Sequence, residues 1–178
     1  KDARQLIDST LKTHGADLDV VIDYFRKKGT KKIFVAGHSY GGGTILHSKK
    51  RNFDAAVLLD PSFKITFTKA RYGAPAGRYV KELKGYFERW GVGVVIGEKM
   101  AHEADALKWE LLTKGWKIPL KIIAAGKGVL IKGAWQYFKL AKGPKELLII
   151  PGATHYFNDR PGMEERVYRE TEKWFRKF

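Results

Sequence analysis

A short apolar run followed by a glycine-rich turn, at residues 33–43, most constrains what this chain can fold into. Residues 33–36 are four consecutive apolar residues after two lysines, a pattern typical of a parallel strand buried on both faces. The chain then reads GHSYGGG at residues 37–43 and continues into residues 44–47, which favour a helix. The sequence therefore predicts a strand, a sharp turn and a helix, with the hydroxyl of Ser39 standing above the edge of a sheet.

The predicted turn requires a strained backbone at Ser39. Gly37 and Gly41 are expected to remove collisions with neighbouring side chains there. The backbone N–H of Tyr40 and the N-terminus of the following helix would stabilise a negative charge that forms beside Ser39. An ordinary glycine-rich turn is the alternative, but the preceding strand and a histidine far downstream, His155, favour a catalytic serine.

Length and composition exclude several classes of protein. At 178 residues we expect one domain, residues 1–178, with no transmembrane span and no signal peptide. The absence of cysteine excludes disulfides, thiolate metal sites and a cysteine nucleophile, and it suits a cytoplasmic protein. The histidines do not recur at zinc-ligand spacing, so we expect no metal site and no cofactor. The lysine-rich composition, with two Asn, two Gln and two Met, is typical of a thermophilic source.

The net charge of +15 raises the possibility of an anionic partner. The lysines and arginines are scattered along the chain, with local clusters only at residues 27–32 and 49–51. No nucleic-acid-binding motif accompanies these clusters, so we expect no nucleic-acid partner.

Strand-like and helix-like segments alternate through the rest of the chain. Three further apolar runs predict strands, at residues 55–60, 119–125 and 146–150, and the segments 133–142 and 164–178 predict helices. This alternation predicts the α/β class, with a mostly parallel sheet and helices on both faces. Residues 63–117, rich in aromatic residues and glycine, interrupt the pattern as a helical insertion, with helices expected at 79–90 and 98–112.

The strand, the GHSYGGG turn and the late His155 together resemble the α/β-hydrolases, in particular their esterase and lipase branch. The resemblance covers nearly the whole chain, but only the C-terminal half of the usual fold. It implies a nucleophilic serine at Ser39, a general base at His155 and a cap or lid formed by residues 63–117. The same aromatic residues could instead be the core of a domain that is short of strands.

The resemblance leaves the position of the acid open. Most of the family carries it after the next-to-last strand, where this chain has Gly128. A branch that resembles the platelet-activating-factor acetylhydrolases and chlorophyllases carries it one strand earlier, where this chain has Asp60 before a proline. Asp60 is therefore the expected acid, although an Asp-Pro turn is also common at the end of a strand. The reserve candidates are Glu98, Glu103 and Asp159.

The chain also departs from the family, because it starts too late to contain the strands that normally precede the nucleophile strand. One of those strands leads into the loop that supplies the second oxyanion N–H, so we expect weak activity unless another group replaces it. The strand at residues 33–36 would become an exposed sheet edge near Ile33. We therefore expect a homodimer that covers this edge.

The resemblance and the departures from it leave two classes of function. The first is a cofactor-free serine carboxylesterase that hydrolyses short- to medium-chain acyl esters, with Phe63 and His38 in contact with the substrate; a lipase, thioesterase or amidase would use the same residues. The second is a binding or assembly module that keeps the hydrolase scaffold with little or no turnover. A nucleic-acid binder is a distant third.

Overall fold

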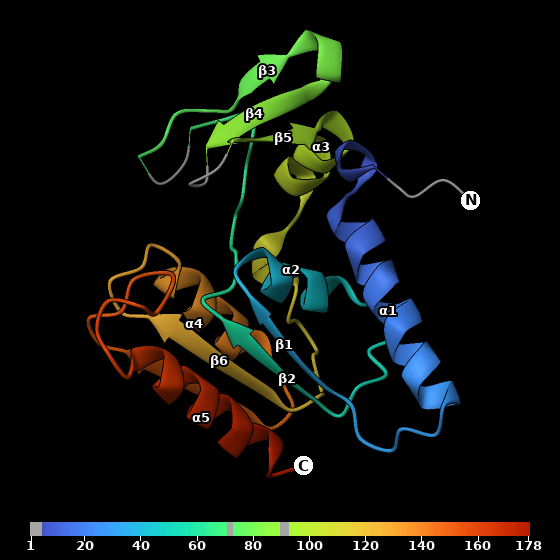
Figure 1. Cartoon of the computed structure of the whole chain (residues 1–178), viewed down its shortest axis with the longest axis vertical. Helices are drawn as coiled ribbons and strands as arrows, with labels where there is room; N and C mark the ends of the chain where they lie inside the picture. The colour runs from blue at the N-terminus through green and yellow to red at the C-terminus, as the bar shows by residue number, and fades with distance from the viewer. Residues whose placement is uncertain (1–4, 71–72, 90–92) are drawn as a thin grey trace.

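A four-stranded parallel sheet forms the centre of the computed structural model, which describes residues 5–70, 73–89 and 93–178 (Figure 1). Its strands are β1 (Phe34–His38), β2 (Ala55–Leu59), β6 (Leu120–Ala125) and β7 (Lys145–Ile150), in the order β1-β2-β6-β7. Each neighbouring pair is parallel. The helices around it are α1 (Leu11–Lys27), α2 (Tyr40–His47), α4 (Ile131–Leu140) and α5 (Met163–Phe175), and a short 3-10 helix, η1 (Leu6–Asp8), precedes α1. These elements confirm the expected α/β class.

Helices cover both faces of the central sheet, because alternate residues of each buried strand point to opposite sides. One buried cluster joins a face of the sheet to α1, α2 and α4; it includes Ile22, Val35, Ile45, Leu58, Ile122 and Tyr137. A second cluster joins the other face to α5; it includes Val57, Ile123, Val167 and Trp174. Within the described ranges, no helix is both long and apolar enough to cross a membrane.

Strand β1 lies at the edge of this sheet, as the sequence predicted. Among the described strands it pairs only with β2. The neighbouring helix α1 exposes a row of apolar side chains, namely Val20, Val21, Tyr24 and Phe25. The described structure therefore has both an unpaired strand edge and exposed apolar surface on α1, two features that favour association.

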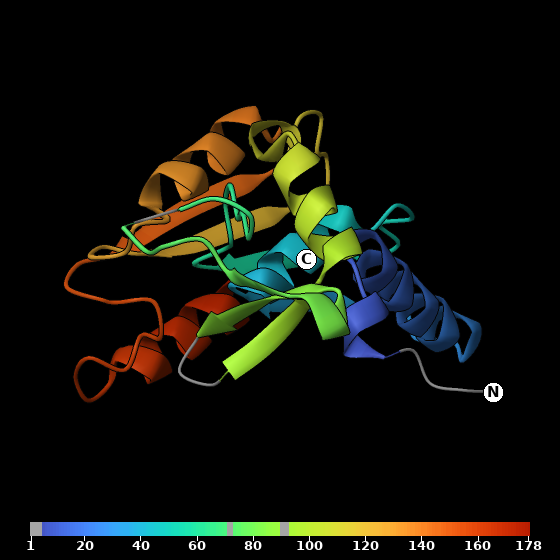
Figure 2. The same cartoon turned by 90° about the horizontal axis from the view of Figure 1, so that it is seen from above.

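The insertion at residues 63–117 contains a second sheet, which the sequence did not predict. Its antiparallel strands are β3 (Arg78–Val80), β4 (Gly85–Arg89) and β5 (Gly93–Gly97), followed by α3 (Glu98–Ala106) and the 3-10 helix η3 (Trp109–Leu111). Figure 1 shows this small sheet beyond the end of the central sheet that carries α2, and Figure 2 shows the same arrangement from above. A third buried cluster joins the insertion to α1; it includes Leu11, Phe67, Ile96, Met100 and Trp109.

The expected helix at residues 79–90 is therefore wrong for its described part, and Trp90 lies outside the described residues. The stretch instead forms strand β3, a short 3-10 turn and strand β4, because Lys84 adopts a left-handed conformation that reverses the chain. Tyr79 and Tyr86 then face each other across the strand pair, an arrangement that favours aromatic residues. The helix expected at 98–112 is present in part, as α3 and the 3-10 turn η3. The insertion is thus mixed β and α rather than helical.

Candidate active site

Ser39 occupies the sharp turn between β1 and α2. Its φ of 54° and ψ of −116° lie in a region that residues with side chains rarely adopt, at a cost of about 1–3 kcal/mol. The strand, turn and helix expected around it are all present. Tyr40 is the first residue of α2, so its backbone N–H has no acceptor within the helix and is available to an anion beside Ser39.

The two glycines of the motif play different roles. A Cβ atom on Gly37 would lie 2.5 Å from the carbonyl carbon of Gly41, so the tight passage of the two backbones requires glycine at position 37. A Cβ atom on Gly41 would meet no atom within 4 Å. The expectation that both glycines relieve a collision therefore holds for Gly37 only. A Cβ atom on Gly42, by contrast, would lie 2.9 Å from Cβ of Pro61.

Asp60 follows the last residue of β2 and is fully buried at the carboxyl end of the central sheet. Its backbone adopts a φ of 39°, which turns the chain away from the sheet. Its N–H donates to the carbonyl of Ile123 at 2.7 Å, and its Oδ1 accepts a hydrogen bond from the N–H of Ala125 at 3.1 Å. Both contacts come from strand β6, so the neighbouring strand fixes the orientation of the carboxylate.

His155 lies in the loop after β7 and meets Asp60 across β6. Its Nδ1 is 2.6 Å from Oδ2 of Asp60, and its side chain is 31% exposed while that of Asp60 is 1% exposed. A hydrogen bond from Nδ1–H to this carboxylate leaves Nε2 as the nitrogen that can accept a proton. The structure therefore brings together the expected acid and the expected base.

Gly128 occupies the slot where most of the resembled family carries its acid. A Cβ atom at this position would lie 3.3 Å from Oδ2 of Asp60. Two carboxylates at positions 60 and 128 would crowd the same small volume and repel each other. Glycine at position 128 is therefore compatible with the aspartate at the end of β2.

His38, the residue before Ser39, contacts His155 directly. Its Nε2 lies 2.8 Å from the backbone carbonyl of His155, and the two ring centroids are 4.5 Å apart. Burial lowers the pKa of His38 below its ordinary value. The neutral ring can donate its Nε2–H to that carbonyl. The contact joins the end of β1 to the loop that carries His155.

A single pocket of about 400 Å³ contains these groups. It is lined by His38, Ser39, Tyr40, Asp60, Ser62, Ile65, Gly128, Val129, Leu130, His155 and Tyr156. This volume suits a small organic substrate. The sequence analysis missed five lining residues: Ser62, Ile65, Val129, Leu130 and Tyr156. Each closely follows Asp60, Gly128 or His155 in the chain and could have been suspected on that ground.

The other proposed site residues lie elsewhere. Phe63 packs against Tyr137 of α4, with ring centroids 5.4 Å apart, and does not belong to the described lining of the pocket. The reserve carboxylates have other partners: Glu98 accepts a hydrogen bond from Tyr79, Glu103 from the Lys12 N–H, and Asp159 from the Thr154 N–H. None of the three contacts His155 through a described hydrogen bond.

The site offers no cluster of metal ligands. Within the described residues, no group of three or more His, Asp or Glu side chains has an arrangement that could hold a metal ion. The side chains that line the pocket do supply a hydroxyl, an imidazole and a carboxylate, which are the groups that acyl transfer through a serine requires.

Comparison with known proteins gives a fold assignment. No protein-family model and no curated protein sequence matches the chain. Among solved structures, Est1E from Butyrivibrio proteoclasticus with bound ferulic acid is similar at a TM-score of 0.75 and 21% identity, over 96% of this chain and 69% of that one. A structure described with the metagenome-derived lipolytic enzymes LipS and LipT gives 0.68 and 18%, over 97% and 76%.

A third similar structure is described as an α/β hydrolase. The α/β hydrolase MGS-MChE2, from a sediment metagenome of the Mar Chica lagoon, matches at a TM-score of 0.63 and 18% identity, over 98% of this chain and 74% of that one. Likeness at this level of identity concerns architecture, and the order of strands in the central sheet agrees with it. The chain has the α/β-hydrolase fold.

Proposed function

We propose that this chain is a serine carboxylesterase that hydrolyses short- to medium-chain acyl esters. The observation that carries the proposal is the convergence of Ser39, Asp60 and His155 in one pocket, with Nδ1 of His155 2.6 Å from the Asp60 carboxylate. Fold alone does not imply an activity, since the α/β-hydrolase scaffold supports many. The strained serine and the paired imidazole supply the chemical argument.

In the proposed first half-reaction, Oγ of Ser39 attacks the carbonyl carbon of the ester while Nε2 of His155 takes its proton. Asp60 keeps the imidazole in the tautomer that protonates at Nε2, and it stabilises the imidazolium that forms. His155 then gives the proton to the leaving alkoxide, and the alcohol departs from an acyl-enzyme on Ser39. In the second half-reaction, a water molecule attacks the acyl-enzyme with the same proton transfers and releases the acid.

The proposed oxyanion site begins at Tyr40. Its backbone N–H is the first of α2, so both this donor and the positive end of the helix dipole would stabilise the oxygen of the tetrahedral intermediate. A single oxyanion donor contributes a factor on the order of 10² to 10³ in rate. The activity is accordingly expected to be weak unless a second donor completes the site.

The proposed role of residues 63–117 is that of a cap. The insertion packs on α1 and Tyr40 through its buried cluster, which includes Phe67, Ile96 and Met100. Its strands stand beside the end of the central sheet where Ser39 and Asp60 are found (Figure 1). A cap in this place would exclude water from the acyl-enzyme and strengthen the electrostatic contacts at the site.

Covalent labelling tests the nucleophile directly. We expect a fluorophosphonate probe to add one label to the wild-type chain, on the peptide that contains Ser39, and expect Ser39→Ala to remove it. Ser62→Ala is the matched control, because Ser62 lines the same pocket but lacks the strained turn. We expect the variant that loses the label to lose hydrolysis of a chromogenic acetyl ester as well, and the variant that keeps the label to keep this activity. Equal rates for wild type and Ser39→Ala would contradict the proposal.

The second candidate is a binding or assembly module without significant turnover. One observation favours it, since no hydrogen bond in the described structure joins Oγ of Ser39 to His155. Such bonds often tighten only when substrate binds, so the esterase remains the preferred proposal. A chain that binds ester analogues but neither reacts with the probe nor hydrolyses esters would be the module.

A further inference from the structure

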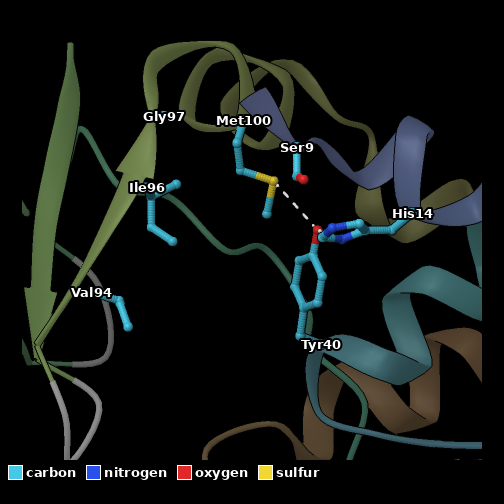
Figure 3. A pocket seen from close by; sticks show the side chains of 7 residues that line it. All are labelled: Ser9, His14, Tyr40, Val94, Ile96, Gly97 and Met100. Carbon is cyan, nitrogen blue, oxygen red and sulfur yellow. Dashed lines mark hydrogen bonds between the residues drawn. The ribbon is translucent and has the colours of Figure 1, made fainter. Parts of the chain in front are cut away.

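A second, smaller cavity shares Tyr40 with the catalytic pocket (Figure 3). Its volume is about 180 Å³, and it is lined by Ser9, His14, Tyr40, Val94, Ile96, Gly97 and Met100. These residues come from three parts of the chain: the segment around the start of α1, the residue after the nucleophile, and the β5–α3 corner of the insertion. The cavity therefore exists only because the insertion packs on the hydrolase core.

The lining of this cavity selects for apolar groups. Val94, Ile96 and Met100 present hydrocarbon and thioether surface to the space in front of the Tyr40 ring (Figure 3). The Tyr40 hydroxyl already has partners, His14 Nδ1 at 3.0 Å and Met100 Sδ at 3.4 Å. Burial raises the pKa of Tyr40, which keeps the phenol neutral. No carboxylate, lysine or arginine belongs to the described lining, so His14 and Tyr40 are the only ionisable side chains among the lining residues.

The polar atom of Ser9 is also satisfied, because its hydroxyl donates to the carbonyl of Gln5 at 3.4 Å. A ligand that needs a hydrogen-bond donor from the hydroxyl of Ser9 or Tyr40 would therefore have to break an existing contact. The size of the cavity gives a second limit. An apolar cavity of about 150 Å³ accommodates benzene, so this one holds a group of about six carbon atoms.

We propose that this cavity binds the apolar acyl group of the ester whose carbonyl reacts at Ser39, with room for about six carbons. The inference rests on the proposed function and adds to it a position and a length limit for the acyl chain. Tyr40 follows Ser39 directly in the chain and lines both cavities, so the second cavity begins beside the residue next to the serine. The residue whose N–H faces the oxyanion thus also guides the acyl chain with its ring.

This arrangement assigns the selection of acyl length to the insertion. Val94 on strand β5 lies across the cavity from Tyr40, and Met100 on helix α3 closes one end of it, where its Sδ contacts the Tyr40 hydroxyl (Figure 3). An aromatic ring in place of Val94 would fill part of the cavity. Shortening Met100, a flexible side chain that adapts to ligands of different shape, would enlarge it. Substituting these two residues therefore changes the volume in opposite directions.

The first test measures kcat/KM for a series of esters with one aryl alcohol and straight acyl chains from acetyl to decanoyl. Each methylene that enters the cavity should raise kcat/KM by about fourfold. The rise should stop near six carbons.

Val94→Trp should lower the ratio of hexanoyl to acetyl kcat/KM by at least tenfold, and Met100→Ala should move the optimum to longer chains. Met163→Ala is the matched control, because Met163 is similarly buried but begins α5 and packs in the cluster on the other face of the central sheet. It should leave the profile as in the wild type.

A binding measurement separates failure of this inference from failure of the proposed function. In a Ser39→Ala background, calorimetry with phenyl hexanoate should show binding that Val94→Trp weakens by at least tenfold and Met163→Ala does not. This result stands even where the wild type hydrolyses no ester, in which case only the proposed function fails. The inference is overturned where Val94→Trp and Met100→Ala, both folded by circular dichroism, leave the acyl profile and this binding unchanged. A wild-type kcat/KM that stays constant from acetyl to decanoyl overturns it as well.

Discussion

His155 Nδ1 lies 2.6 Å from Asp60 Oδ2, although 95 positions separate the two residues in the chain. Strand β6 lies between the strands that carry them, in the order β2-β6-β7, so the pair closes over the carboxyl end of β6. The N–H of Ala125 on that strand holds the second carboxylate oxygen. The geometry therefore depends on a parallel sheet in which β2 and β7 are next-nearest neighbours.

Removing the charge of Asp60 tests this pair. We expect Asp60→Asn to fold and to lower kcat by about four orders of magnitude, because the amide favours the wrong imidazole tautomer. Glu103→Gln is the control, since Glu103 accepts a hydrogen bond from the N–H of Lys12 instead. Its kcat should stay within a few-fold of wild type. Near-wild-type turnover in Asp60→Asn would show that the acid lies elsewhere.

The two motif glycines give a matched pair of alanine substitutions. Gly37→Ala places its Cβ 2.5 Å from backbone atoms of Gly41, which cannot move without distorting the turn. We expect this variant to lose about 2–4 kcal/mol of unfolding free energy, together with most of its activity. Gly41→Ala should keep the stability of the wild type or gain slightly, because position 41 is in a helix with open space beside it. Urea unfolding of both variants checks the pair, and equal losses would refute this difference in role.

We expect His38 to position the base, His155, in addition to any contact that it makes with the substrate. His38→Phe keeps a ring against His155 but loses the hydrogen bond to its backbone carbonyl. We expect kcat to fall by about fivefold with little change in KM, because the loop that carries His155 loses one hydrogen bond. His102→Phe, on the exposed face of α3, is the control. A change confined to KM would support substrate contact instead.

Stability should decrease in mildly acidic solution. Burial lowers the pKa of both His38 and His47 in the folded chain. Below pH of about 6.5 the unfolded chain binds protons at these residues that the folded chain does not, so the free energy of unfolding falls as the pH drops from 7 to 5. The carboxylates with a lowered pKa, among them Asp54, Glu146 and Glu170, lose their contribution to the free energy of unfolding only at lower pH.

Urea unfolding between pH 7.5 and 5 measures this dependence. Nε2 of His47 is buried without a partner, so His47→Leu removes one of these two histidines and breaks no contact at Nε2, although it loses the hydrogen bond between Nδ1 and the Gly43 carbonyl at 2.7 Å. We expect the variant to lose less unfolding free energy than the wild type between these two pH values. An equal or steeper loss would show that other groups control the acid response.

We expect the edge strand β1 to be covered by a second copy of the chain. The unpaired edge and the exposed apolar residues of α1, which include Val21 and Phe25, favour such a contact. Light scattering after size exclusion should give twice the mass of 20.2 kDa at micromolar concentration. Val21→Lys with Phe25→Lys should shift the population to the monomer. A wild-type chain that is monomeric at this concentration contradicts the prediction.

The insertion shows why local sequence patterns failed in part. Residues 79–90 contain apolar and charged residues at spacings that fit a helix, yet Tyr86 pairs with Tyr79 and Ile96 in neighbouring strands. Strand pairing depends on partners distant in the chain, and such partners are not visible in a local pattern. The same reason hid the second cavity, whose walls come from residues between Ser9 and Met100.

The sequence alone determined the strand, turn and helix around Ser39 and the alternation that builds a parallel sheet. These features are local, because an apolar run, a glycine and a helix start act over a few residues. Only the tertiary structure decided that Asp60 rather than a residue near Gly128 meets His155, that Phe63 packs on α4, and that His38 holds the loop of His155. Those contacts depend on which strands become neighbours, and long-range packing of the whole chain sets that order.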